Sequence, residues 1–160
     1  MKIMKIACAS LLIYANMNAP VFAQKSQNWS MKSTDKLCKS SKMDASGRVR
    51  LDVVRYAFQD NFGITVSNPI YRDSGVSLEN EMVLRFDDNY RTEVRVDGAM
   101  HSSMLIIGSI AISDNQRFSN LMARSNNLKV YFNDDMILNI GLHGSSAMLD
   151  GLEACVNKIK

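Results

Sequence analysis

The sequence predicts an α+β fold rich in β-structure: an antiparallel sheet, or a partial sandwich, with two short helices, the second at the C-terminus. Short segments in which apolar and polar residues alternate recur along the chain, separated by turn residues. The last segment changes to helical spacing, and no internal repeat or domain boundary interrupts the pattern. We therefore expect about seven strands in one domain, with the helices packed against the sheet.

The C-terminal part of the chain shows the pattern most clearly. Two alternating apolar runs flank the turn residues Asn133, Asp134 and Asp135, which predicts a β-hairpin. The apolar positions of these runs are Leu128, Val130, Phe132, Met136, Leu138, Ile140 and Leu142. After Gly144, Ser145 is placed to cap a helix. The apolar face of this helix consists of Met148, Leu152, Cys155 and Ile159.

The middle of the chain predicts further strands and the first helix. Residues 48–58 alternate with a phase shift, which indicates either a bulge or a strand covered on both faces, and residues 40–47 favour a turn. A second hairpin is predicted around Asp87 and Asp88, with strands at 82–86 and 92–96. A central strand is predicted at 104–112, where Gly108 either weakens the strand or marks a close backbone approach. A capping box at 113–116 begins the first helix, which runs to about residue 125.

The first residues of the chain predict a cleaved secretory signal. Residues 1–23 contain two lysines, then a short apolar run, and end at Ala23 before a polar residue. We expect one periplasmic or secreted domain of residues 24–160 after cleavage near Ala23, with a retained N-terminal anchor as the alternative. The apolar run is shorter than the roughly 20 residues that cross a bilayer, so no membrane span is predicted.

The charge of the chain excludes an obvious nucleic-acid surface. The leader holds two of the 19 basic residues and none of the 16 acidic ones, so the rest of the chain is close to neutral. No dense group of lysines and arginines interleaves with aromatic residues. Four lysines lie near one another in sequence, and we interpret them as a solvated edge. They are Lys32, Lys36, Lys39 and Lys42.

The number and positions of the cysteines are consistent with an exported protein. Cys8 lies in the leader, which leaves Cys38 and Cys155. In an oxidising compartment such a pair favours a disulfide over a reactive dithiol, and no C-x-x-C motif is present. A bridge closing so long a loop would stabilise the fold by up to about 4–5 kcal/mol. Only His101 and His143 could supply imidazole to a metal, at no recognisable ligand spacing, so no metal site is predicted.

Neither a catalytic residue nor a cofactor is predicted. The paired aspartates fall at hairpin tips, where they favour turn geometry over acid–base or metal chemistry. His143 could act with Ser145 or Ser146 in a small hydrolase or a ligand carrier, yet no nucleophile elbow is present. We interpret His143 as an exposed histidine at a strand–helix junction, and His101 as a loop residue.

Several motifs together resemble a known family. They are Arg85-Phe86-Asp87 in a strand, Phe118-x-x-Leu121-Met122 in a helix, the spacing of Leu142, Gly144, Ala147, Leu152 and Cys155, and Trp29 followed by Cys38. This set resembles small exported bacterial proteins of the invasion-associated locus B type. The resemblance implies a β-rich periplasmic or secreted domain without known catalytic residues, and no site residue is carried over from it.

These observations predict a non-enzymatic binding or accessory protein of a Gram-negative envelope that acts through a protein surface. The partner would be another protein, either a host factor or a cognate toxin. The candidate partner-facing residues are Tyr71, Arg72 and Asp73, in a loop at 67–80, together with the hairpin tips. One alternative is a periplasmic immunity protein or inhibitor against a toxin or lysozyme. The other is a small hydrolase or ligand carrier that uses His143.

Overall fold

A computed structural model describes residues 29–70, 81–102 and 105–160, without the side chains of residues 101 and 102. In these ranges the chain forms one antiparallel sheet of nine strands with two α-helices, the second at the C-terminus. The predicted α+β fold is therefore confirmed. The predicted signal at 1–23 lies outside the described residues. None of the helices in the described ranges is long and apolar enough to span a membrane.

The described ranges contain nine strands, two α-helices and two short 3₁₀ turns. The strands are β1 (Ser30–Ser33), β2 (Leu37–Met43), β3 (Arg50–Tyr56), β4 (Phe62–Ser67), β5 (Glu81–Phe86), β6 (Glu93–Ser102), β7 (Leu105–Ser109), β8 (Asn127–Phe132) and β9 (Asp135–Gly141). The helices are α1 (Asn115–Arg124) and α2 (Ser145–Ile159), and the short 3₁₀ turns are η1 (Tyr90–Thr92) and η2 (Ile112–Asp114). The strand order in the sheet is β1-β2-β3-β4-β7-β6-β5-β8-β9.

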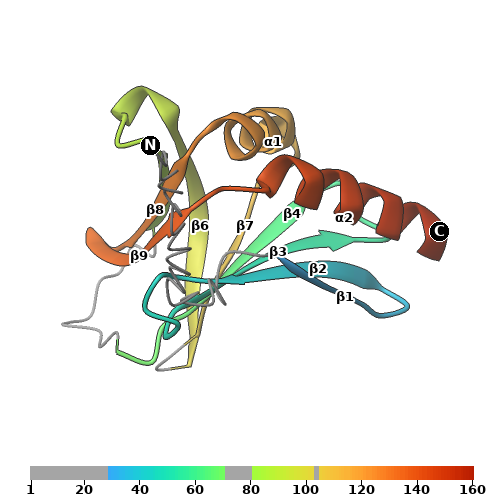
Figure 1. Cartoon of the computed structure of the whole chain (residues 1–160), viewed down its shortest axis with the longest axis horizontal. Coiled ribbons are helices and arrows are strands. Elements are labelled where there is room, and N and C mark those ends of the chain that lie inside the picture. Colours follow the sequence, from blue (N-terminus) through green and yellow to red (C-terminus); the bar gives the residue numbers. More distant parts are fainter. Residues whose placement is uncertain (1–28, 71–80, 103–104) are drawn as a thin grey trace, which may run out of the picture.

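The sheet curls around the two helices, which lie side by side on its inner face (Figure 1). Along most strands the inward positions are apolar and buried, while most outward positions are polar. The largest completely buried side chains include Phe86, Leu84, Ile64 and Leu51 from the sheet and Phe118 and Met122 from α1. α2 adds Met148, Leu152 and Val156 to the same core. Both helices are therefore held by one continuous apolar layer.

A disulfide joins the second strand to the last helix. The sulfur atoms of Cys38 on β2 and Cys155 on α2 lie 1.94 Å apart, the distance of an S–S bond, as the sequence predicts. The two residues are separated by 117 positions in the chain. The bond fixes α2 across β2 and β3, on the inner face of the sheet.

Both predicted hairpin tips are tight turns that use acidic or amide residues. Asp87 and Asp88 have φ of 51° and 55°, and Asn133 and Asp134 have φ of 49° and 68°. Two successive positive φ values are typical of the type I′ turn. At Asn133 and Asp134 this turn joins β8 directly to β9 and matches their twist, whereas the η1 turn separates Asp88 from β6. The carboxylate of Asp87 also accepts hydrogen bonds from the N–H groups of residues 126 and 127. The aspartates serve the turns, as predicted.

The N-terminal strands were only partly predicted. Residues 40–43, predicted as a turn, belong to β2, and β1 adds a further strand at the sheet edge. The alternation of β2 is concealed because two of its three inward residues, Ser40 and Lys42, are polar. Residues 51–54 of β3 are all buried, which resolves the phase shift there in favour of a strand covered on both faces.

Both helices begin differently from the prediction. α1 follows η2 and starts at Asn115, and Asp114 provides no side-chain cap, so the capping box at 113–116 is not formed. α2 starts after Gly144, whose φ of 80° suits a residue without Cβ. The hydroxyl of the buried Ser145 donates to the carbonyl of Met122 in α1 and caps nothing. The tertiary hydrogen bond replaces the predicted local one.

Two glycines lie opposite each other on the inner face of the sheet, where larger side chains pack tightly against them. Gly98 of β6 pairs with Gly108 of β7, and both positions point inward. A Cβ at Gly98 would lie 2.9 Å from Cβ of Met82 and 3.0 Å from the Phe132 ring. Of the two alternatives for Gly108, the close approach is the one observed, since its Cβ would meet the Met82 sulfur at 2.8 Å.

We expect Gly98→Ala to lower the free energy of unfolding by about 1–3 kcal/mol, because the methyl group overpacks a rigid part of the core. Chemical denaturation measures the change. Gly151→Ala is the matched control: its Cβ would meet only the mobile end of Met31, and alanine favours a helix. Equal stability of the Gly98→Ala variant and the wild type would contradict this packing.

We expect the double variant Cys38→Ala/Cys155→Ala to lose about 3–5 kcal/mol of unfolding free energy, because the bond constrains a very long loop in the unfolded chain. Urea unfolding with and without reductant measures the loss, and reductant should leave the double variant unaffected. Thiol titration of the unreduced, denatured protein provides an independent check. Two free thiols per chain would contradict the bond.

Candidate functional site

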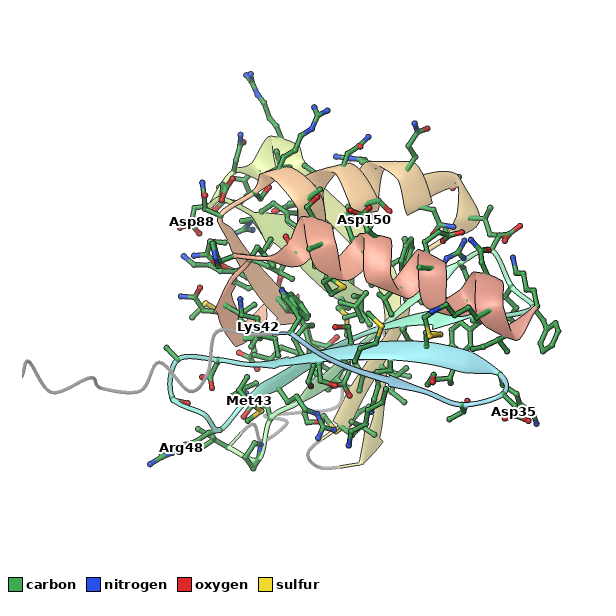
Figure 2. All side chains as sticks on the ribbon, turned by 45° about the vertical axis from the view of Figure 1, so that its right-hand side comes forward. Asp35, Lys42, Met43, Arg48, Asp88 and Asp150 are labelled. Atoms are coloured by element: carbon green, nitrogen blue, oxygen red, sulfur yellow. A yellow bond between two sulfur atoms is a disulfide. The ribbon has the colours of Figure 1, made fainter. Side chains whose placement is uncertain are left out.

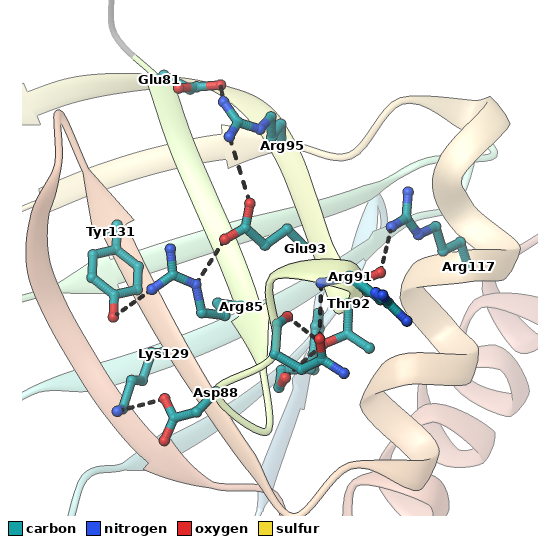
Figure 3. A network of polar contacts seen from close by, with 12 residues as sticks. Glu81, Arg85, Asp88, Arg91, Thr92, Glu93, Arg95, Arg117, Lys129 and Tyr131 are labelled. Atoms are coloured by element: carbon teal, nitrogen blue, oxygen red, sulfur yellow. Dashed lines mark hydrogen bonds and ion pairs between the residues drawn. The ribbon is translucent and has the colours of Figure 1, made fainter.

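The outer face of β5, β6 and β8 carries a connected group of charged and aromatic side chains (Figure 3). We call it the arginine–tyrosine patch and define it by Arg85, Tyr90, Glu93, Arg95 and Tyr131. The outward positions of these strands follow from their alternation, since the intervening residues fill the core. The sequence predicts a charged outward face on this hairpin, and the structure shows how its members connect.

Arg85 lies at the centre of the patch. Its Nε is 2.7 Å from Oε1 of Glu93, directly across the β5–β6 pair, and its Nη1 donates to the Tyr131 hydroxyl at 3.1 Å. The guanidinium carbon also lies 3.9 Å from the centre of the Tyr90 ring and 4.5 Å from that of Tyr131. Arg85 is thus held by an ion pair and by two aromatic rings.

One carboxylate of the patch, that of Glu93, is shared between two arginines. Arg95 contacts Glu81 at 2.7 Å and the second oxygen of Glu93 at 3.5 Å. The hydrogen bond to Glu93 is the main cause that raises the pKa of Arg85, and the bond to Glu81 does the same for the pKa of Arg95. Every cation of this chain of contacts therefore has a counter-charge within the fold.

The η1 turn places Tyr90 over Arg85. The Asn89 side chain accepts a hydrogen bond from the N–H of Arg91, and the Thr92 hydroxyl donates to the carbonyl of Phe86. These bonds fix the turn that follows Asp88. Tyr90 remains 73% exposed although its ring is held in place. Beside it lies a hollow of about 460 Å³, lined on one side by Asp114 of η2 and Arg117 of α1.

The sequence-predicted site residues are distributed differently. Tyr71, Arg72 and Asp73 lie outside the described residues, and so does the side chain of His101. His143 lies on the β9–α2 connection with an exposed side chain, as predicted. In the described part of the chain, no hydrogen bond joins its imidazole to a serine or a carboxylate. The hydroxyl of Ser145 instead donates a hydrogen bond to the carbonyl of Met122. The structure does not bring together a His143–Ser145 pair.

Lys42 is the residue that the sequence interpretation placed wrongly. It is only 4% exposed, whereas a solvated edge requires exposure. Figure 2 shows it on the side of β2 that faces α2, opposite its neighbour Met43. Its Nζ donates to the main-chain carbonyl of His143 at 3.1 Å and lies 5.4 Å from the centre of the Trp29 ring. Within the described ranges no carboxylate lies within ion-pair distance of it.

Burial lowers the pKa of Lys42 from the ordinary value of 10.5. Burial removes the water that stabilises the charged ammonium. The neutral carbonyl of His143 and the face of the Trp29 ring replace only part of this stabilisation. Two hollows meet at His143, one of about 450 Å³ beside Trp29 and one of about 360 Å³ beside Lys42. No cluster of three or more metal-ligating side chains occurs among the residues that the structure describes.

We expect Lys42→Met to raise the free energy of unfolding by about 1–2 kcal/mol at neutral pH, because it removes a buried charge that has no counter-charge. Below the lowered pKa, Lys42 is charged in both the folded and the unfolded chain, and the full cost applies. Above 10.5 both states are neutral and the cost disappears, so the advantage of the variant should shrink as pH rises toward 10.5. Urea unfolding from pH 7 upward measures this, and Lys32→Met is the exposed control. A less stable Lys42→Met variant would contradict the unpaired charge.

Comparison with known proteins does not place this chain in a family. No family model, curated protein or solved structure matches this chain. The resemblance to the invasion-associated locus B type therefore stays a prediction.

Proposed function

We propose that this protein is an exported, non-enzymatic binding or accessory protein that recognises another protein through the arginine–tyrosine patch. The observation that carries the proposal is the clamped guanidinium of Arg85, held between Tyr90 and Tyr131 on an open face of the sheet. Tyrosine and arginine, together with tryptophan, are enriched among the residues that dominate the binding energy of protein interfaces.

The rigidity of the patch supports a binding role. Ordering long side chains on association costs free energy, and Arg85 and Tyr90 are already ordered by the ion pair and the η1 turn. The ring of Tyr90 contributes little to the core because it is mostly exposed. The hollow beside it, bordered by Arg95 and Arg117, offers a recess for a side chain of the partner. The patch thus combines an aromatic surface with fixed charges of both signs.

The kind of partner follows from the predicted compartment. Export and the resemblance to the invasion-associated locus B type favour a host factor, whereas an immunity protein or inhibitor would bind a toxin or lysozyme. Both versions need a protein-binding face on a small stapled fold, and the patch supplies one. The identity of the captured partner distinguishes them.

We expect Tyr90→Ser to weaken binding of the partner about 30-fold, the effect of losing a contact worth about 2 kcal/mol. The tagged protein would be cross-linked in an envelope extract and in a host-cell extract, and the captured protein identified, purified and titrated. Because Tyr90 is exposed, the variant should keep the unfolding transition of the wild type.

Phe58→Ser is the matched control, since Phe58 is 78% exposed and lies between β3 and β4, away from the patch. A partner that binds the wild type and Phe58→Ser but is weakened by Tyr90→Ser would support the proposal. Equal binding by all three proteins, or no stoichiometric partner in either extract, would contradict it.

A further inference from the structure

We propose that the junction of Trp29, Lys42 and His143, at the start of α2, binds the oxyanion head of a small ligand, a carboxylate or a phosphate. The ligand's apolar body would lie in the adjoining hollow against Met31 and Met148. This site is separate from the arginine–tyrosine patch, which lies on the outer face of the sheet, and its existence does not depend on the proposed protein partner.

The first observation is the missing negative charge around Lys42. Lysines that are this deeply buried almost always have a carboxylate partner. Here the described surroundings offer the ammonium one neutral acceptor, the carbonyl of His143, and one aromatic ring. Two of its three N–H donors have no acceptor within the described ranges. Among the residues that the structure describes, neither of the two hollows that meet at His143 is lined by an aspartate or a glutamate.

The second observation is that Lys42 lies at the positive end of a helix. The carbonyl that it contacts belongs to His143, the residue just before Gly144, which precedes the first turn of α2. Helix α2 has 15 residues, and its N-cap residue is Gly144, which has no side chain with which to cap the helix. The N–H groups of Ser146 and Ala147 therefore lack the acceptor that a capping side chain would supply. An ammonium and a helix N-terminus repel each other, and an anion between them would satisfy both.

The third observation is an unused donor on Trp29. Its indole Nε1 is buried and has no hydrogen-bond partner in the described structure. The Cδ1 atom next to that nitrogen lies 3.6 Å from the point where Gly144 would carry a Cβ. Any larger residue at Gly144 would narrow this approach as well as strain a φ of 80°. Donors of three kinds, from β2, from the segment before β1 and from the start of α2, thus lie at one junction.

The linings of the hollows indicate the rest of the ligand. Around Trp29 the wall consists of Met31, Ala147 and Met148, with Ser40 and His143 as the polar members. A hollow of about 450 Å³ falls within the range of small-molecule sites. Methionine side chains adapt to ligands of different shape, so charge and size would select the ligand more than a fixed outline.

The test uses the fluorescence of Trp29, which is the only tryptophan in the sequence. Benzoate and phenyl phosphate are the two anionic probes, and benzamide is the uncharged analogue of benzoate. We expect saturable quenching by at least one anion in the millimolar range or below, and none by benzamide. Response to benzoate alone indicates a carboxylate ligand, and response to phenyl phosphate alone indicates a phosphate ligand; each outcome supports the site.

Lys42→Met should weaken the binding of the anion at least tenfold, whereas Lys32→Met, on the exposed strand β1, should bind as the wild type does. In the wild type, the amide resonances of Ser146 and Ala147 should shift on titration, which a purely structural Lys42 would not cause. This second measurement remains decisive if Lys42→Met does not fold. Absence of saturable binding by both anions, equal binding by the Lys42→Met variant, or unshifted amides at the start of α2 would overturn the proposal.

Discussion

The packing of α2 against β2 is the constraint on which the rest of this structure depends. The strands between them curl into a single sheet, and the open inner face of that sheet is closed only when the last helix meets the second strand (Figure 1). The disulfide between Cys38 and Cys155 fixes this meeting across nearly the whole length of the domain. The same face of β2 carries Ser40 and Lys42, so the strand that holds the covalent link also brings a lysine beneath the start of α2. The inner face of β2 therefore holds the fold together and also contributes the lysine of the candidate anion site.

Periodicity identified strands wherever inward and outward residues differ in polarity. Residues 82, 84 and 86 are apolar and buried, while Arg85 faces outward, and this contrast was visible in the sequence. The contrast disappears in β2, where polar side chains occupy the buried face, and the strand was therefore assigned in part to a turn. For the same reason Lys42 was grouped with exposed lysines. A buried polar residue leaves no periodic signal in the sequence. Lys42 is buried by Trp29, which precedes β1, and by His143, which lies just before α2 and is distant in sequence.

Local signals at helix ends were overridden in a similar way. Ser145 is a residue type that often caps a helix, and it lies at the start of α2. Its hydroxyl nevertheless donates to the carbonyl of Met122, which comes near only because α1 packs beside α2. Turn chemistry was more reliable, because the positive φ values at both hairpin tips are a local property of aspartate and asparagine, and the bonds of Asp87 to residues 126 and 127 only add to a turn that the local sequence already favours. The arginine–tyrosine patch could be predicted only in part. Alternation indicated that Arg85 and Glu93 face outward, whereas the position of Tyr90 above them depends on the η1 turn and could not be inferred from spacing.

The two candidate sites differ in how their cations are balanced, and this difference determines what each can recognise. On the outer face, Glu93 pairs with both Arg85 and Arg95, and Glu81 pairs with Arg95. A partner therefore gains little from charge alone and would be recognised by the tyrosine rings and the shape around them. Beneath α2, the ammonium of Lys42 has no counter-charge within the described ranges, and the free energy that its burial costs is recovered only when a negative group arrives. The fold therefore tolerates a destabilising residue at the helix junction, whereas the outer patch stabilises the hairpin on which it lies. A lysine that served only to hold α2 would be better replaced by an apolar side chain of similar length, and its presence at this point is explained most simply by an anion that it binds.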